Sequence, residues 1–147
     1  MELSTRYISN SYNDTILFAK RFAKRISEDD LSKGKIFLLK GELGAGKTAF
    51  VRGFASYWKI DEQVVSPTFT IVNEYKNDKV KISHIDLYRL SFSEEVEELG
   101  LLDIIEESNY SFIEWPEKAI GLLKEAMYTT IKITLGKDES ERIIEIK

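Results

Sequence analysis

Gly41-Glu42-Leu43-Gly44-Ala45-Gly46-Lys47-Thr48 is an octet that matches the pattern G-x-x-x-x-G-K-[ST]. Its glycines allow backbone dihedral angles that side chains forbid, so successive N–H groups can turn inward around an anion. The apolar run 35–40 before it is typical of a buried strand, and residues 49–55 after it are typical of the first turns of a helix. Strand, glycine loop and helix are the context that this motif requires, so the octet predicts a phosphate-binding loop.

Each part of this loop has an expected role in binding a nucleoside triphosphate. The Lys47 amino group reaches the β- and γ-phosphates of such a ligand, and the Thr48 hydroxyl takes a Mg²⁺ coordination position. The positive end of the following helix dipole points at the same place. The residues that we expect to contact the nucleotide here are Gly41, Glu42, Leu43, Gly44, Ala45, Gly46, Lys47, Thr48 and Ala49.

The bulk composition is that of one ordinary domain. The chain has 147 residues, 43% of them hydrophobic and 31% charged, so we expect a single domain spanning 1–147 around one core. It contains no cysteine, which excludes a disulfide framework, a thiolate nucleophile and cysteine-ligated metal. No apolar run approaches the ~20 residues needed to cross a membrane, and residues 1–6 lack the apolar core of a signal peptide. These features favour the cytoplasm and no membrane partner.

The charge distribution bears on nucleic-acid binding. A formal net charge of -4 argues against a protein that holds nucleic acid through its overall field. Lys20, Arg21, Lys24 and Arg25 form a local basic cluster, but their spacing is typical of the solvated face of a helix.

Hydrophobic periodicity and turn residues predict the remaining elements. Before the loop we expect a strand over 3–8 and a helix over 12–26, capped by Ser11 or Asn13. After the octet we expect a helix that ends near residues 57–58, a hairpin of 69–75 with 80–87, and a helix through residue 99 opened by a capping box at 91–94. A helical turn at 101–106, a strand at 110–113 and a hairpin of 128–135 with 141–146 complete the expected elements. Together they predict an α/β fold, a single P-loop NTPase-like domain with a mixed parallel and antiparallel central sheet flanked by helices.

Two acids stand at the ends of predicted strands, where the ligands of open α/β sheets bind. Asp86 closes the run 82–86, and Glu114 closes the run 112–114. Mg²⁺ prefers hard oxygen ligands, and hydrolysis needs a group that orients the attacking water. We assign Asp86 to Mg²⁺, through water, and Glu114 to the attacking water; the same pattern is compatible with the two roles exchanged.

Four other residues have more than one interpretation each. Thr68 either meets Mg²⁺ and the γ-phosphate, as switch threonines do, or caps a strand with Ser66. His84, the only histidine, is more often a hydrogen-bonded core residue in such a strand than a catalytic base. Trp115 either stacks at the nucleotide site or anchors packing beside Pro116. Arg89 is a charge-stabilising finger, a partner contact or a member of a surface ion pair.

These motifs together resemble one family, the bacterial TsaE (YjeE) ATPases of tRNA threonylcarbamoyladenosine synthesis. The resemblance covers nearly the whole length, and beyond the phosphate loop it is specific in order and spacing. The residues that carry it are Gly41–Thr48, Arg52-Gly53, Ser66-Pro67-Thr68-Phe69, His84-Ile85-Asp86-Leu87-Tyr88-Arg89-Leu90 and Glu114-Trp115-Pro116.

The resemblance implies an activity, partners and further site residues. It implies that Thr68 lies in a switch-like loop at the metal. The metal-site residues are then Thr48, Thr68, Asp86 and Glu114. It also implies that Asp86 takes the Walker B part, that Glu114 acts in hydrolysis with Lys47, and that Trp115 lies near the nucleotide. The family hydrolyses ATP with Mg²⁺ in support of a partner pair, TsaB and TsaD. That pair transfers the threonylcarbamoyl group to tRNA, so the resemblance implies contact with tRNA only through the complex.

Two other classes of function remain compatible with the loop. A small-molecule kinase usually has an arginine-rich lid and a pocket-forming insert, whereas this chain offers only Arg52 and Arg89 near the motifs and no lid-like insert between them. A nucleotide-gated binding module with negligible hydrolysis would act through the shape that it adopts with nucleotide bound. Direct tRNA binding by this chain alone is a weaker possibility because of the acidic balance.

Overall fold

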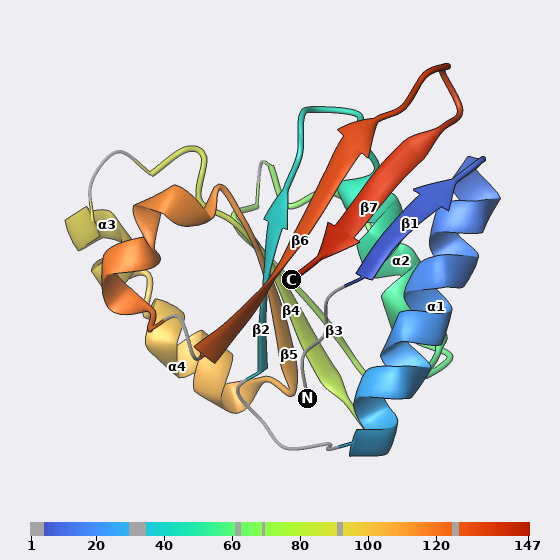
Figure 1. Cartoon of the computed structure of the whole chain (residues 1–147). Coiled ribbons are helices and arrows are strands. Elements are labelled where there is room, and N and C mark those ends of the chain that lie inside the picture. Colours follow the sequence, from blue (N-terminus) through green and yellow to red (C-terminus); the bar gives the residue numbers. More distant parts are fainter. Residues whose placement is uncertain (1–4, 30–34, 61–62, 69, 91–92, 125–126) are drawn as a thin grey trace.

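Seven strands form one sheet in the order β1-β7-β6-β2-β5-β4-β3 (Figure 1). The computed structural model describes residues 5–29, 35–60, 63–68, 70–90, 93–124 and 127–147. The strands are β1 (Thr5–Ser9), β2 (Lys35–Lys40), β3 (Val72–Lys76), β4 (Lys81–Asp86), β5 (Tyr110–Glu114), β6 (Tyr128–Leu135) and β7 (Arg142–Ile146). The four central strands, β6, β2, β5 and β4, are parallel to one another, whereas β7, β1 and β3 add antiparallel pairs at the edges. The predicted mixed sheet is therefore confirmed.

The central strands are covered on both faces, which explains their continuous apolar sequences. Every residue of β5 is buried, and so is every residue of β4 after the first. Because parallel strands end at the same edge of a sheet, the ends of β2, β4 and β5 meet there. This arrangement brings the octet, Asp86 and Glu114 to one place.

Helices cover the two faces of the sheet (Figure 1). The helix α1 (Tyr12–Asp29) and the helix α2 (Lys47–Ser56) pack on one face, in a core rich in aromatic rings. Short helices pack on the other face, and these are α3 (Ser93–Glu98), α4 (Leu101–Glu107), η1 (Pro116–Lys118) and η2 (Ile120–Leu122). Within the described residues, no helix is both long enough and apolar enough to cross a membrane.

The contact of α1 with α2 requires a glycine. A Cβ atom on Gly53 would lie 2.3 Å from the carbonyl oxygen of Ile16 and 2.9 Å from the Cβ of Ala19. The opposite face of α1 carries the predicted exposed basic cluster, Lys20, Arg21, Lys24 and Arg25. The cap of α1 is Ser11, whose Oγ accepts a hydrogen bond from the Asp14 N–H at 3.0 Å.

Several predicted boundaries were wrong by a few residues. The helix α1 runs three residues beyond residue 26, and α2 begins at Lys47 rather than at residue 49 and ends at Ser56. The strand β3 begins at Val72 rather than at residue 69, because Ile71 has a left-handed φ of 68° and donates its N–H to the Pro67 carbonyl in a turn. The expected capping box at 91–94 and the first residues of the strand at 3–8 extend outside the described residues.

Candidate functional site

A cavity of about 770 Å³ opens at the edge of the sheet where β2, β4 and β5 end. Most of the predicted site residues line it, and these are Leu43, Gly44, Ala45, Gly46, Lys47, Thr48, Ala49, Thr68, Asp86, Glu114 and Trp115. Gly41 and Glu42 are not among the lining residues, and their backbone carbonyls accept hydrogen bonds from Lys47 Nζ and the Ala45 N–H. The structure thus assembles the segments that the sequence analysis singled out one by one.

The octet folds as a loop with two left-handed glycines. Gly44 has φ 81°, and Gly46 has φ 112° and forms the N-terminal boundary of α2. The Ala45 N–H donates to the Glu42 carbonyl at 3.0 Å, and the Ala45 side chain is buried beneath the loop. At Gly41, a Cβ atom would lie 2.6 Å from the Ile133 carbonyl oxygen, so the loop leaves β2 at a point where only glycine fits.

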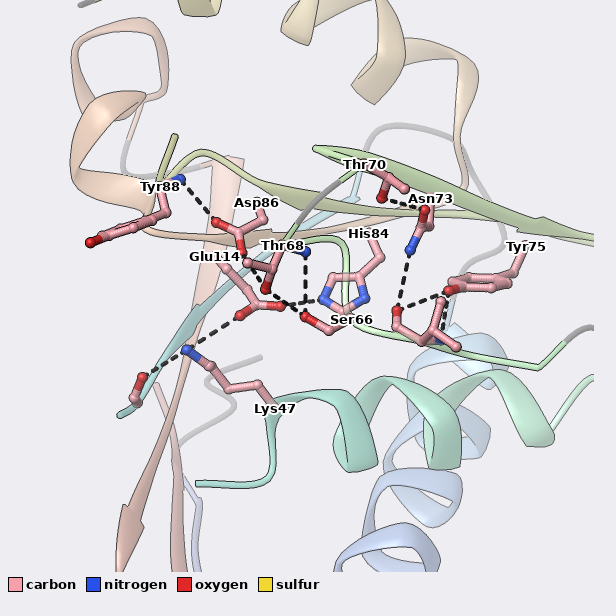
Figure 2. A network of polar contacts seen from close by, with 12 residues as sticks. Lys47, Ser66, Thr68, Thr70, Asn73, Tyr75, His84, Asp86, Tyr88 and Glu114 are labelled. Atoms are coloured by element: carbon pink, nitrogen blue, oxygen red, sulfur yellow. Dashed lines mark hydrogen bonds and ion pairs between the residues drawn. The ribbon is translucent and has the colours of Figure 1, made fainter. Parts of the chain in front are cut away.

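Lys47 extends from the first turn of α2 across the loop (Figure 2). Its Nζ donates to the Gly41 carbonyl oxygen at 2.8 Å and lies 3.3 Å from Glu114 Oε1. The Lys47 side chain is 13% exposed and that of Glu114 is 6% exposed, so this ion pair is largely shielded from water. Because water screens this pair little, the electrostatic attraction between the two charges is stronger than it would be at an exposed site.

Glu114 has a second partner in His84, on the neighbouring strand β4 (Figure 2). His84 Nε2 lies 2.6 Å from Glu114 Oε2, and the imidazole is fully buried. Among the residues that the structure describes, none is a hydrogen-bond partner of its Nδ1. Burial by itself would raise the pKa of Glu114, but the His84 hydrogen bond, and the charges of His84 and Lys47, outweigh it and lower the pKa. His84 is therefore the hydrogen-bonded core residue that the sequence favoured, and its partner is the predicted catalytic acid.

Asp86 lies beside Glu114 and has different partners. Its Oδ1 accepts a hydrogen bond from the Tyr88 N–H at 2.9 Å, and the Thr68 hydroxyl donates to Oδ2 at 3.4 Å. Ser66 Oγ is 2.7 Å from Thr68 Oγ1, so the two hydroxyls form one chain that leads to this carboxylate. These neighbours are neutral, in contrast to those of Glu114.

The segment that carries Thr68 is fastened to β3. Tyr75 Oη accepts from the Val65 N–H at 3.0 Å and donates to the Val65 carbonyl at 3.1 Å, while Asn73 Nδ2 donates to the same carbonyl at 3.2 Å (Figure 2). The Asp86 N–H donates to the Ile71 carbonyl at 2.7 Å, which ties the far end of this segment to the end of β4. Thr68 is thereby held within reach of Asp86.

An aromatic pair stands at the cavity. Trp115 follows β5 with a left-handed φ of 56°, an uncommon conformation for a bulky residue. Its ring centroid lies 4.8 Å from that of Tyr88, and the two side chains are 45% and 56% exposed. Both residues line the cavity, so a ligand bound there would lie beside this aromatic pair.

The arginines of the site were not those that the sequence suggested. Arg52 donates to the Val64 carbonyl at 2.8 Å and to the Tyr12 hydroxyl, and neither Arg52 nor the exposed Arg89 is among the residues that line the cavity. The lining residues that the sequence analysis missed are Tyr12, Thr15, Glu139, Ser140 and Arg142. They come from the start of α1 and from the β6–β7 hairpin, and no motif marks them in the sequence.

The donor atoms suit Mg²⁺. Thr48, Thr68 and Asp86 supply hydroxyl and carboxylate oxygens to one cavity, and hard oxygen donors are what this ion prefers. Within the described residues no cluster of three or more histidine, aspartate or glutamate side chains forms a metal cage. Mg²⁺ usually keeps several waters and binds through one or two protein oxygens and phosphates, so this sparse set fits it. Both oxygens of Glu114 already face Lys47 and His84, which leaves Glu114 the least free of the predicted metal-site residues.

The fold and the loop define an α/β protein of the P-loop class. A profile of the family described as "Threonylcarbamoyl adenosine biosynthesis protein TsaE" matches residues 9–144. The chain is 39% identical over 146 residues to the tRNA threonylcarbamoyladenosine biosynthesis protein TsaE of Haemophilus influenzae, covering 99% of this chain and 90% of that protein. The corresponding protein of Nostoc is 40% identical over 124 residues, covering 80% of this chain and 73% of its own length.

A solved structure shares the same fold. The crystal structure of Bacillus subtilis YdiB superimposes with a TM-score of 0.76 at 26% identity, covering 99% of this chain and 86% of that one. This chain belongs to the TsaE family.

Proposed function

We propose that this protein binds ATP with Mg²⁺ and hydrolyses it in support of threonylcarbamoyladenosine synthesis on tRNA. The observation that carries the hydrolytic part is the placement of Glu114 beside the phosphate loop, 3.3 Å from the Lys47 amino group. The pathway part rests on membership of the TsaE family.

Lys47 and the loop amides bind the phosphates in this proposal. Phosphate oxygens compete with Glu114 Oε1 and the Gly41 carbonyl for the three donors of the Lys47 ammonium group. The nucleotide loosens the hold of Lys47 on Glu114, which leaves one carboxylate oxygen available for water. Binding and preparation of the catalytic acid are thereby coupled through a single lysine.

Glu114 then orients the water that attacks the γ-phosphate. Its lowered pKa keeps it ionised at neutral pH, so it accepts a hydrogen bond from that water. His84 fixes the other carboxylate oxygen at 2.6 Å and thereby sets the direction of the first. In this arrangement His84 is a positioning residue and Glu114 is the catalytic one.

Thr48, Thr68 and Asp86 would hold Mg²⁺, Asp86 through water. When bound, the ion neutralises charge that develops on the phosphate oxygens. The Thr68 hydroxyl already lies against the Asp86 carboxylate, so the segment that carries it can respond to a ligand at this position.

The proposed partners are a TsaB–TsaD pair, which performs the transfer to tRNA, and the proposed location is the cytoplasm. The test is steady-state Mg-ATP hydrolysis by the purified protein, alone and with that pair. We expect slow turnover alone and clear stimulation by the pair. Turnover that does not change on mixing would contradict the coupling and favour a free-standing NTPase or a kinase. ATP binding without turnover, both by the protein alone and with the pair, would favour a nucleotide-gated binding module.

A further inference from the structure

Arg142 joins the phosphate loop to a distant hairpin. It is the first residue of β7, yet its Nε donates to the Ala45 carbonyl at 3.0 Å and its Nη2 donates to the Gly44 carbonyl at 3.3 Å. Its Nη1 donates to the carbonyls of Glu139 at 2.7 Å and Glu141 at 2.9 Å. Four of the five N–H groups of this guanidinium therefore face backbone carbonyls, two in the loop and two in the hairpin.

The two loop carbonyls that Arg142 contacts belong to different kinds of peptide unit. The Gly44 carbonyl shares its unit with the Ala45 N–H, which donates to the Glu42 carbonyl within the loop. The Ala45 carbonyl shares a peptide unit with the Gly46 N–H, at the N-terminal boundary of α2. Since the two ends of a trans peptide unit point in opposite directions, holding this carbonyl toward Arg142 holds the Gly46 N–H away from it. A charged donor on the carbonyl also polarises the unit and makes the N–H a better donor.

The base of this contact is rigid. Arg142 pairs in register with Leu135 on β6 and with Ser9 on β1, so its backbone is fixed on both sides. The hairpin turn is fastened by Asp138 Oδ1, which accepts hydrogen bonds from the backbone N–H groups of Ser140 and Glu141. The loop itself has two glycines at positive φ and is intrinsically free to adopt other conformations. Arg142 thus connects an ordered hairpin to a loop that needs an external restraint.

We propose that Arg142 is a positioning residue of the phosphate site, which holds the Ala45 carbonyl outward so that the Gly46 N–H faces the nucleotide phosphates, and which braces the loop further through the Gly44 carbonyl. The nucleotide in this inference comes from the proposed function, on which the inference rests. The contacts of Arg142 with the loop do not depend on that function. It assigns to the β6–β7 hairpin a part in nucleotide affinity.

The first experiment measures nucleotide binding by calorimetry in R142A, R142K and the control K137A. Lys137 is an exposed cation of the same hairpin, so its removal changes charge without touching the loop. We expect R142A to raise the Kd for ATP and ADP about tenfold, as for the loss of charge-assisted hydrogen bonds, and to change Kd more than it changes kcat at saturating ATP. K137A should match the parent, and methylguanidine added to R142A should restore part of the affinity.

R142K separates geometry from charge. A single ammonium group cannot span four carbonyls, so we expect R142K to bind ATP more weakly than the parent. Parental affinity in R142A would overturn the proposal, and parental affinity in R142K would overturn the part assigned to the guanidinium geometry. Urea unfolding of each variant checks that the fold is retained.

A second measurement needs no nucleotide. Amide hydrogen exchange of residues 44–48 should be faster in R142A than in the parent and in K137A. Unchanged exchange would overturn the positioning role even if affinity fell. If the parent binds neither nucleotide, the proposed function fails, and the exchange result still decides whether Arg142 orders the loop.

Discussion

Asp86 and Glu114 are neighbours in the sheet, with the same burial and different surroundings. They pair in register at the ends of β4 and β5, and the exposed fraction of each whole residue is 4%. Glu114 lies between the cationic Lys47 and the His84 imidazole, whereas Asp86 accepts from the Tyr88 N–H and the Thr68 hydroxyl. Two carboxylates at equivalent positions are thus given different chemistry by the groups that touch them.

This difference favours one division of roles over its exchange. A carboxylate held by neutral hydroxyl and amide donors can give an oxygen to a metal-bound water without breaking an ion pair. In the proposed function Lys47 binds phosphate, so we expect the carboxylate paired with Lys47 to respond to nucleotide. The partners therefore support Asp86 at Mg²⁺ and Glu114 at the attacking water, and the following variants test that division.

Lys47→Ala should have the largest effect, because it removes both the proposed phosphate contact and the counter-charge of Glu114. We expect kcat/KM for ATP to fall on the order of 10²–10³-fold, as for the loss of a charge-stabilising group at a reacting centre. The measurement is steady-state hydrolysis together with calorimetric binding. Lys40→Ala is the matched control, since Lys40 is an exposed lysine at the end of β2. Equal losses in the two variants would show that the effect is not specific to the site.

Glu114→Gln should separate hydrolysis from binding. The amide keeps the shape of the side chain but orients water poorly, so we expect kcat to fall about 10²-fold. The Kd for ATP should stay within a few-fold of the parental value, or improve, because Lys47 is released from its ion pair. Parental turnover in this variant would contradict the role given to Glu114.

Asp86→Asn should change the dependence on Mg²⁺. We expect the Mg²⁺ concentration for half-maximal turnover to rise about tenfold, with part of the rate recovered at high Mg²⁺, since a water-bridged carboxylate contributes charge. Titration of Mg²⁺ at fixed ATP measures this in both acid variants. A Mg²⁺ shift in Glu114→Gln and none in Asp86→Asn would reverse the assignment.

The pH dependence of stability should show the smallest effect. Because the folded-state pKa of Glu114 lies below its ordinary value of 4.5, the unfolded chain binds more protons between those two values. The stability contributed by this group is therefore fully present above about pH 4.5 and is lost as pH falls through the lower, folded-state pKa. Urea unfolding of the parent and of Glu114→Gln measures it.

The difference in stability between these two proteins should shrink as pH falls through that window. Comparison with Glu114→Gln is needed because Asp14 and Asp138 also have lowered pKa values, through hydrogen bonds in exposed places. A constant difference across the window would show that the surroundings of Glu114 do not favour its ionised form.

Local patterns predicted most of the fold. The octet, the hairpin around Asn77 and the strands expected at 110–113 and 128–135 carry their signals within a few residues, and each was found to within a few residues of its expected bounds. The errors fell at ends such as the start of β3, where the left-handed Ile71 belongs to a turn that Pro67 and Asp86 complete from both sides. Such a turn depends on a partner strand and has no local signature.

The candidate site was predicted less completely than the fold. Four of the predicted residues that line the cavity lie in recognisable local patterns, and these are Lys47, Thr68, Asp86 and Glu114. Arg142 has no such pattern around it. Arg142 acts on Ala45 and Gly44 across 97 and 98 positions of the chain, through a contact that exists only once β7 has joined the sheet. The meeting of His84 with Glu114, 30 positions apart, has the same origin.

The sequence by itself determined the glycine-rich octet between a strand and a helix, the class of sheet and the placement of two acids at strand ends. Each of these depends on a spacing of residues along the chain, because backbone dihedral preferences and side-chain periodicity act over a few positions. Only the tertiary structure decided which acid contacts Lys47 and His84, which acid contacts Thr68, and which arginine contacts the loop. Those choices depend on strand order and on short-range contacts between buried groups, and both are set by the packing of segments far apart in the chain.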